Sequence, residues 1–173
     1  MKFKRLSKFD IVVLALCGLA VATYFYSRGP SESQMIAKYH RQKAEFEQIR
    51  LMLQKDSNVF VISERWVRAQ DSFGKDGQWL GELPLNISES RLALYRERLK
   101  NLGLASVRSN PELGQVTFYQ FGGGFTDTSW SIGYLWSQKP PSPLVKSAYH
   151  QMPGQNHSHY SRLQDKWYIY HHR

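Results

Sequence analysis

The sequence predicts an α+β protein: an N-terminal transmembrane helix, a second helix, and a compact domain with one helix packed on an antiparallel sheet of four to six strands. Three observations support this prediction. Residues 11–26 carry no charge, residues 31–55 and 86–102 repeat apolar residues at helical spacing, and twelve aromatic residues follow residue 115. Aromatic residues favour the half-buried surface of a pleated sheet, so the pattern is that of helices layered on a sheet.

The N-terminal segment predicts a membrane anchor. A helix over residues 9–26, with Asp10 at its cytoplasmic edge, is close to the ~20 residues that cross a bilayer core. Cations that flank such a helix hold that end in the cytoplasm, and four precede this one: Lys2, Lys4, Arg5 and Lys8. We expect residues 1–28 to form a cytoplasmic stub and a signal-anchor, single-pass, with the rest of the chain beyond the membrane.

Two other fates of this segment stay open. Ala20-Val21-Ala22 has the small-x-small pattern that signal peptidase cleaves, which would release the domain. Cys17 lies in a lipobox-like context and could be lipidated, although Leu16 is a poor match for the small residue expected there.

Residues 29–56 predict an amphipathic linker helix. Ser31 and Gln34 form a capping-box pattern at its start. One apolar stripe follows, which packs either on the chain's own sheet or on a partner helix; its members are Ile36, Tyr39, Phe46, Ile49 and Leu53.

Residues 57–173 are expected to form the α+β domain. Its helix begins with a cap at Asn86 and Glu89 and ends at Gly103, where a left-handed cap favours glycine. The predicted strands are 59–62 with a possible extension through 66–67, 104–108, 115–121, 125–136, and a last hairpin that pairs 159–163 with 167–171.

Composition restricts the function classes. Residues 1–28 hold five of the 23 basic residues and one of the 14 acidic residues, so the remainder carries a surplus of five positive charges. That surplus suits a domain near an anionic lipid surface. No basic stretch interleaved with aromatics predicts a nucleic-acid partner. Cys17 is the only cysteine, which excludes disulfides and thiolate chemistry from the domain.

The histidines near the C-terminus are weak candidates for a metal site. His159 and His171 would lie on neighbouring strands of the last hairpin, and His157 is two residues from His159. The simpler interpretation is exposed polar residues near a chain end, so we predict no metal ion and no cofactor.

No residue pattern predicts catalysis. No serine lies in a Gly-x-Ser-x-Gly elbow. Gly122-Gly123-Gly124 leads into strand-like sequence rather than into a phosphate-binding helix. We therefore predict no catalytic residue. The interaction candidates are instead in a Gly-rich loop over 70–84, namely Trp79, Phe73 and Lys75.

Several stretches together resemble a family of short, uncharacterised proteins of Gram-negative bacteria that begin with one hydrophobic segment. They are residues 46–56, 95–104, Gly133-Tyr134-Leu135-Trp136-Ser137, Lys139-Pro140-Pro141-Ser142-Pro143-Leu144-Val145 and Trp167-Tyr168. The resemblance implies a bacterial inner-membrane protein with a small periplasmic α+β domain, and it implies no activity.

The expected function is non-catalytic binding in the cell envelope, through the sheet face or the 70–84 loop. The ligand would be another envelope protein or a small envelope molecule, and nothing predicts the oligomeric state. One alternative is an immunity protein against a toxin that acts on the membrane or periplasm. Another is a metal-dependent hydrolase that uses the C-terminal histidines.

Overall fold

The computed structural model describes residues 29–69, 86–123, 130–148 and 158–172. The chain divides into two units, Met1–Pro30 and Ser31–Arg173, and the described fold belongs to the second. Its elements run in the order α2 (Glu32–Lys55), β1 (Val59–Ser63), β2 (Val67–Ala69), α3 (Glu89–Asn101), β3 (Ser106–Asn110), β4 (Gln115–Gly123), β5 (Trp130–Ser137), β6 (His159–Gln164) and β7 (Trp167–His172).

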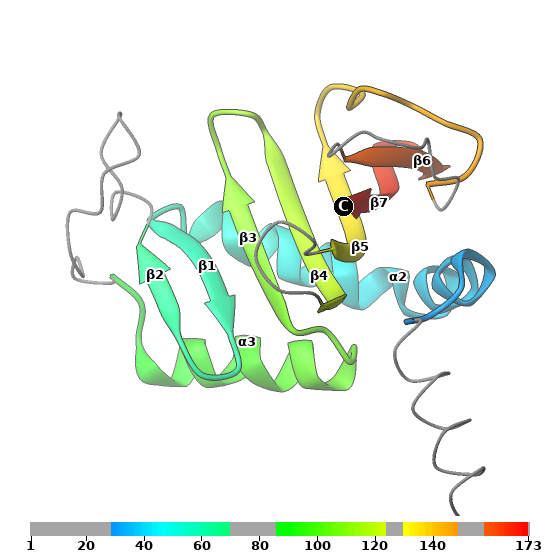
Figure 1. The fold of residues 1–173 in the computed structure, drawn as a ribbon. Coiled ribbons are helices and arrows are strands. Elements are labelled where there is room, and N and C mark those ends of the chain that lie inside the picture. The colour runs from blue at the N-terminus through cyan, green and yellow to red at the C-terminus, as the bar shows by residue number, and fades with distance from the viewer. Residues whose placement is uncertain (1–28, 70–85, 124–129, 149–157, 173) are drawn as a thin grey trace, which may run out of the picture. The chain divides into compact units, whose positions relative to one another are not determined.

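The strands form one antiparallel sheet in the order β2-β1-β3-β4-β5-β7-β6 (Figure 1). The α+β class is confirmed, but the prediction of four to six strands is wrong, because the described sheet has seven. The additional strand is β2. The Ser63 N–H donates to the Trp66 carbonyl at 2.9 Å and closes a turn. The chain therefore reverses direction after β1 instead of extending it.

Helix α2 begins at the predicted capping box. The Ser31 hydroxyl accepts from the Gln34 N–H at 3.3 Å, and the Gln34 side chain accepts from the Ser31 N–H at 2.8 Å. The helix packs on its own sheet: the Phe46 ring lies 5.3 Å from Phe118 and 4.7 Å from Tyr134. Ile36, predicted in the apolar stripe, is instead 38% exposed, because its neighbour Met35 occupies the buried position one helical turn before Tyr39.

Helix α3 begins two residues later than predicted. Ser88 is its cap, with its hydroxyl accepting from the Arg91 N–H at 3.2 Å, so the predicted Asn86 cap is wrong. The predicted end is confirmed, since Gly103 follows the helix at φ +56°. Glycine adopts this left-handed conformation without the steric cost that a Cβ atom brings.

Both helices pack on the same face of the sheet and share one hydrophobic core with it (Figure 1). Alternate residues of each strand point into this core, among them Val107, Val116, Phe118, Ile132, Tyr134 and Ile169. The opposite face carries a separate, smaller cluster around Leu135, Tyr168 and Tyr170.

Among the described residues, no helix is long and apolar enough to cross a membrane. The anchor predicted over 9–26 lies outside those residues.

Candidate functional site

A row of tyrosines crosses the face of the sheet opposite the helices. Across neighbouring strands, Tyr119 on β4 pairs with Gly133 on β5, and Gly133 pairs with Tyr170 on β7. Tyr170 in turn pairs with Tyr160 on β6. Paired residues of neighbouring antiparallel strands point to the same side of a sheet. Four strands therefore bring three phenol rings together around one glycine.

Gly133 provides the space for this arrangement. A Cβ atom there would lie 2.7 Å from Cε1 of Tyr170 and 1.9 Å from the carbonyl oxygen of Phe118. Any other residue would have to displace the tyrosine ring and the neighbouring backbone. The glycine is therefore required by the close approach of its two neighbouring strands.

A β-bulge adds a polar row beside the tyrosines. The register between β4 and β5 shifts between Tyr119 and Phe121. Beyond the bulge, Ser131 on β5 pairs with Gly122 on β4 and with His172 on β7. The Ser158 hydroxyl lies 3.1 Å from Nδ1 of His172 and extends this row.

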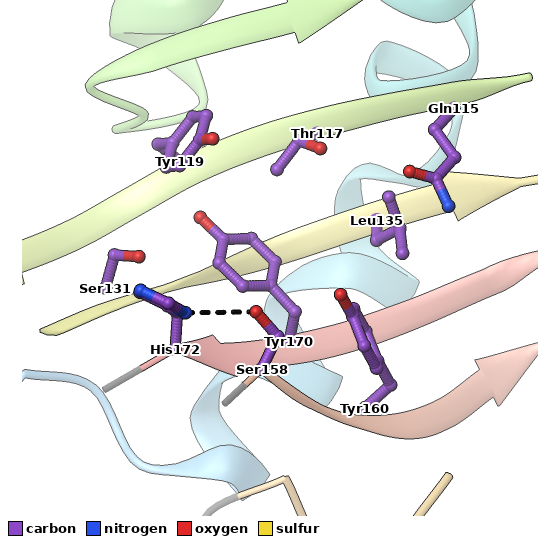
Figure 2. Close-up of a pocket in the computed structure, with 9 residues that line it drawn as sticks. All are labelled: Gln115, Thr117, Tyr119, Ser131, Leu135, Ser158, Tyr160, Tyr170 and His172. Atoms are coloured by element: carbon purple, nitrogen blue, oxygen red, sulfur yellow. Dashed lines mark hydrogen bonds between the residues drawn. The ribbon is translucent and has the colours of Figure 1, made fainter. Parts of the chain in front are cut away.

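The two rows, together with the neighbouring pair Thr117 and Leu135, line an open pocket of about 240 Å³ on the helix-free face. Figure 2 shows its side chains projecting from β4, β5, β7 and β6 and from the residue before β6. The pocket is lined by Gln115, Thr117, Tyr119, Ser131, Leu135, Ser158, Tyr160, Tyr170 and His172. Among the residues that the structure describes, the lining therefore holds no carboxylate, ammonium or guanidinium group.

Tyr170 forms the most buried polar group of this pocket. The residue is 5% exposed, and its Oη atom has no hydrogen-bond partner in the described part of the chain. Ser131 lies close enough to lower the pKa of Tyr170 through its hydroxyl, although the two groups do not form a hydrogen bond of normal geometry. Burial raises the pKa of Tyr170 well above its ordinary value, and the neighbouring Tyr119 raises it further. The phenol therefore stays protonated, and it can donate a hydrogen bond to a ligand.

The third tyrosine is held by contacts along the edge of β6. The Val145 N–H donates to the Tyr160 carbonyl at 2.8 Å, and the Tyr160 N–H donates to the Pro143 carbonyl at 3.3 Å. The pairing of residues 143–145 with β6 covers an edge that would otherwise expose unpaired backbone groups. It also fixes the position of Tyr160 beside the pocket.

Glu32, at the start of α2, forms hydrogen bonds to the β6 edge of the sheet. Its carboxylate accepts from the hydroxyls of Ser147 and Ser161 and from the Ala148 N–H, the last at 3.2 Å. A carboxylate in the first turn of a helix is also stabilised by the helix dipole. One side chain therefore connects α2, the 143–148 segment and β6.

The predicted histidine pair lies on neighbouring strands, as expected for the hairpin, since His159 is directly opposite His171. His159 is buried, and its Nε2 atom has no hydrogen-bond partner among the described residues. Within that part of the chain, no three His, Cys, Asp or Glu side chains are close enough to hold a metal ion. His157, the third candidate, lies outside the described residues.

The interaction candidates Trp79, Phe73 and Lys75 also lie outside the described residues and stay predictions. Sequence reasoning named the sheet face but missed the tyrosine pocket. The available signal was the alternation of Gln115, Thr117 and Tyr119 with buried residues along one strand. That alternation predicts a polar outer face, but it does not show which residues of distant strands meet there.

No protein-family model, curated protein or solved structure matches the chain.

Proposed function

We propose that the protein is a non-catalytic binding module of the bacterial cell envelope, tethered by residues 9–26. It takes up a small polar ligand, or a polar group of a larger envelope molecule, in the tyrosine pocket. The observation that carries the proposal is the Tyr170 hydroxyl, which is buried at the pocket and has no partner among the described residues. A buried polar group without a hydrogen bond costs about 1–3 kcal/mol, which a ligand would recover.

The composition of the pocket supports binding rather than hydrolysis. Ser158 and His172 are in contact, but the described lining contains no carboxylate to orient the imidazole. The ring also meets the serine through Nδ1, whereas the established serine triad uses Nε2 as the base and Nδ1 for the orienting acid. The pair is better suited to hydrogen bonding with a ligand than to activating a nucleophile.

Site-specific photo-crosslinking tests the proposal in the native membrane. A benzophenone amino acid is placed at Tyr119, which lines the pocket, in the full-length protein. A second variant carries it at Leu51, which is 48% exposed on α2 and serves as the matched surface control. We expect a discrete adduct, of small molecule or macromolecule, at position 119 and not at position 51.

The same adducts at both positions, or none at either, would contradict binding at the pocket. A third variant at Trp79 tests the predicted loop independently. An adduct at position 79 alone would move the binding site from the sheet face to the 70–84 loop.

A further inference from the structure

The electrostatic character of the pocket restricts its ligand. The protein has a net charge of +9, yet the described pocket lining has no acidic or basic group apart from His172. A charged ligand entering the hollow beside Tyr170 would lose hydration, and among the described lining residues only His172 could offset its charge. The lining therefore favours a ligand without net charge.

The arrangement of the rings argues against an aromatic cage for a cation. Such cages place open ring faces around the charge. Here Tyr119 and Tyr170 meet edge to face, with centroids 5.7 Å apart and planes at 80°. The edge of one ring thus occupies a face of the other, so the two faces cannot both serve one cation.

The polar groups of the pocket can each donate and accept a hydrogen bond. Tyrosine and serine hydroxyls have this property, and the Gln115 amide has both kinds of atom. Figure 2 shows these groups around the Tyr170 ring. A ligand that matches them presents hydroxyl or amide groups along its edge and C–H groups on its face, which is the surface of a sugar ring.

We propose that the pocket binds an uncharged sugar residue of a glycan chain. This inference rests on the proposed function and specifies its ligand. The pocket volume of about 240 Å³ is below the roughly 300–1,000 Å³ of sites for drug-sized molecules, so it accommodates a single residue of such a chain. The half-buried rings of Tyr119 and Tyr160 pack against the C–H face, and the Tyr170 hydroxyl donates to a ligand oxygen.

Three oligosaccharides that differ mainly in charge test this ligand class. They are a neutral N-acetylglucosamine oligomer, its cationic deacetylated form, and an anionic oligomer that alternates N-acetylglucosamine with glucuronate. Binding to the full-length protein is measured by isothermal titration calorimetry in lipid nanodiscs, because maltoside detergents would supply the proposed ligand class. We expect the neutral oligomer to bind and the two charged oligomers to bind at least tenfold more weakly.

Two pocket variants and one control locate the binding. Tyr170→Phe keeps the buried ring and removes only its hydroxyl, so we expect a loss of affinity of about three- to tenfold. Tyr119→Ala removes a half-buried aromatic contact and should reduce affinity by about tenfold or more. Lys100→Ala, at an exposed position of α3 away from the pocket, should leave the affinity unchanged.

Tighter binding of the cationic or anionic oligomer, or equal loss in the Lys100 variant, would overturn the inference. If the neutral oligomer does not bind but position 119 still forms an adduct in the membrane, the sugar is rejected as the ligand and the pocket is retained as the binding site. Failure of both measurements would reject the pocket as well.

Discussion

Gly133 and Tyr170 face each other across the β5–β7 pair, and a Cβ atom on Gly133 would lie 2.7 Å from Cε1 of the tyrosine. The contact connects the fold to the pocket, because the ring that fills the space above the glycine also carries the buried hydroxyl. The same absent side chain lets the Phe118 carbonyl approach from β4.

Gly133→Ala should therefore destabilise the domain and disturb the pocket. We expect a loss of about 1–3 kcal/mol or more, as for overpacked cores, measured by thermal unfolding with near-ultraviolet circular dichroism. Gly103→Ala is the matched control. Among the described residues, its Cβ would meet only the end of Lys38, at 3.7 Å, so the variant should lose about 1 kcal/mol through the positive φ alone. Equal effects of the two variants would contradict the role given to Gly133.

Asp56 joins the two helices through Tyr95. Its carboxylate accepts from the Tyr95 hydroxyl at 2.7 Å and from Nε of Arg91 at 2.9 Å. Tyr95→Phe should lower the free energy of unfolding by about 1.5–3 kcal/mol, because it removes a hydrogen bond to a charged acceptor. Chemical denaturation measures the loss. Tyr160→Phe, at a half-buried site on β6, is the control, and a loss as large as that of Tyr95→Phe would count against the assignment.

Lys38 should give the stability a specific pH dependence. Burial, with a further contribution from Arg41, lowers its pKa from 10.5 to about 8, and its ammonium donates to the Gly103 carbonyl at 3.4 Å. Below about pH 8 both folded and unfolded states are charged, and the folded state bears the full desolvation penalty. Between about 8 and 10.5 the unfolded state holds more protons, so the contribution of Lys38 to stability rises with pH.

Lys38→Met removes both the penalty and its titration. We expect the variant to be more stable than the wild type at pH 7, with a stability difference that shrinks toward pH 10.5. The measurement is the difference in unfolding free energy between the two proteins at several pH values. A difference that stays constant or grows with pH would show that the ammonium is not desolvated in the fold.

Glu32 should hold the edge of the sheet in place. Its carboxylate accepts hydrogen bonds from Ser147, Ala148 and Ser161, so Glu32→Gln removes the charge that strengthens them. We expect a loss of about 1–3 kcal/mol and faster hydrogen exchange at the β6 amides. Glu89→Gln is a closely matched control, because it is also the first residue of a helix behind a serine cap. Unchanged exchange in the Glu32 variant would contradict the connection.

Local signals predicted the parts of the fold that depend on neighbouring residues. The Ser31–Gln34 capping box and the Gly103 cap each act within one helical turn, and the last hairpin is closed by a short turn. Strand β2 was missed because three residues become a strand only by pairing with β1. The bulge after Tyr119 also escaped prediction, since it is defined by the partner strand.

The pocket depends on long-range register, which explains why the sequence did not predict it. Tyr119 and Tyr170 are far apart in the chain and meet only because β5 lies between β4 and β7. A shift of one residue in either pair would turn one ring toward the helices. Composition indicated a sheet rich in aromatics, but only the strand order assigns these rings to one face.

The start of α3 is the helix boundary that differs between the sequence prediction and the structure, and it can be tested by mutation. The sequence offers two possible caps, each three residues before a matching helical position: Asn86 before Glu89, and Ser88 before Arg91. In the structure the cap is Ser88, whose backbone is extended and whose hydroxyl accepts from the Arg91 N–H. Ser88→Ala should therefore cost about 1 kcal/mol, whereas Asn86→Ala should change the unfolding free energy by less than about 0.5 kcal/mol. Both values come from chemical denaturation of the two single variants. A larger loss for Asn86→Ala would mean that the helix begins at Asn86 in solution.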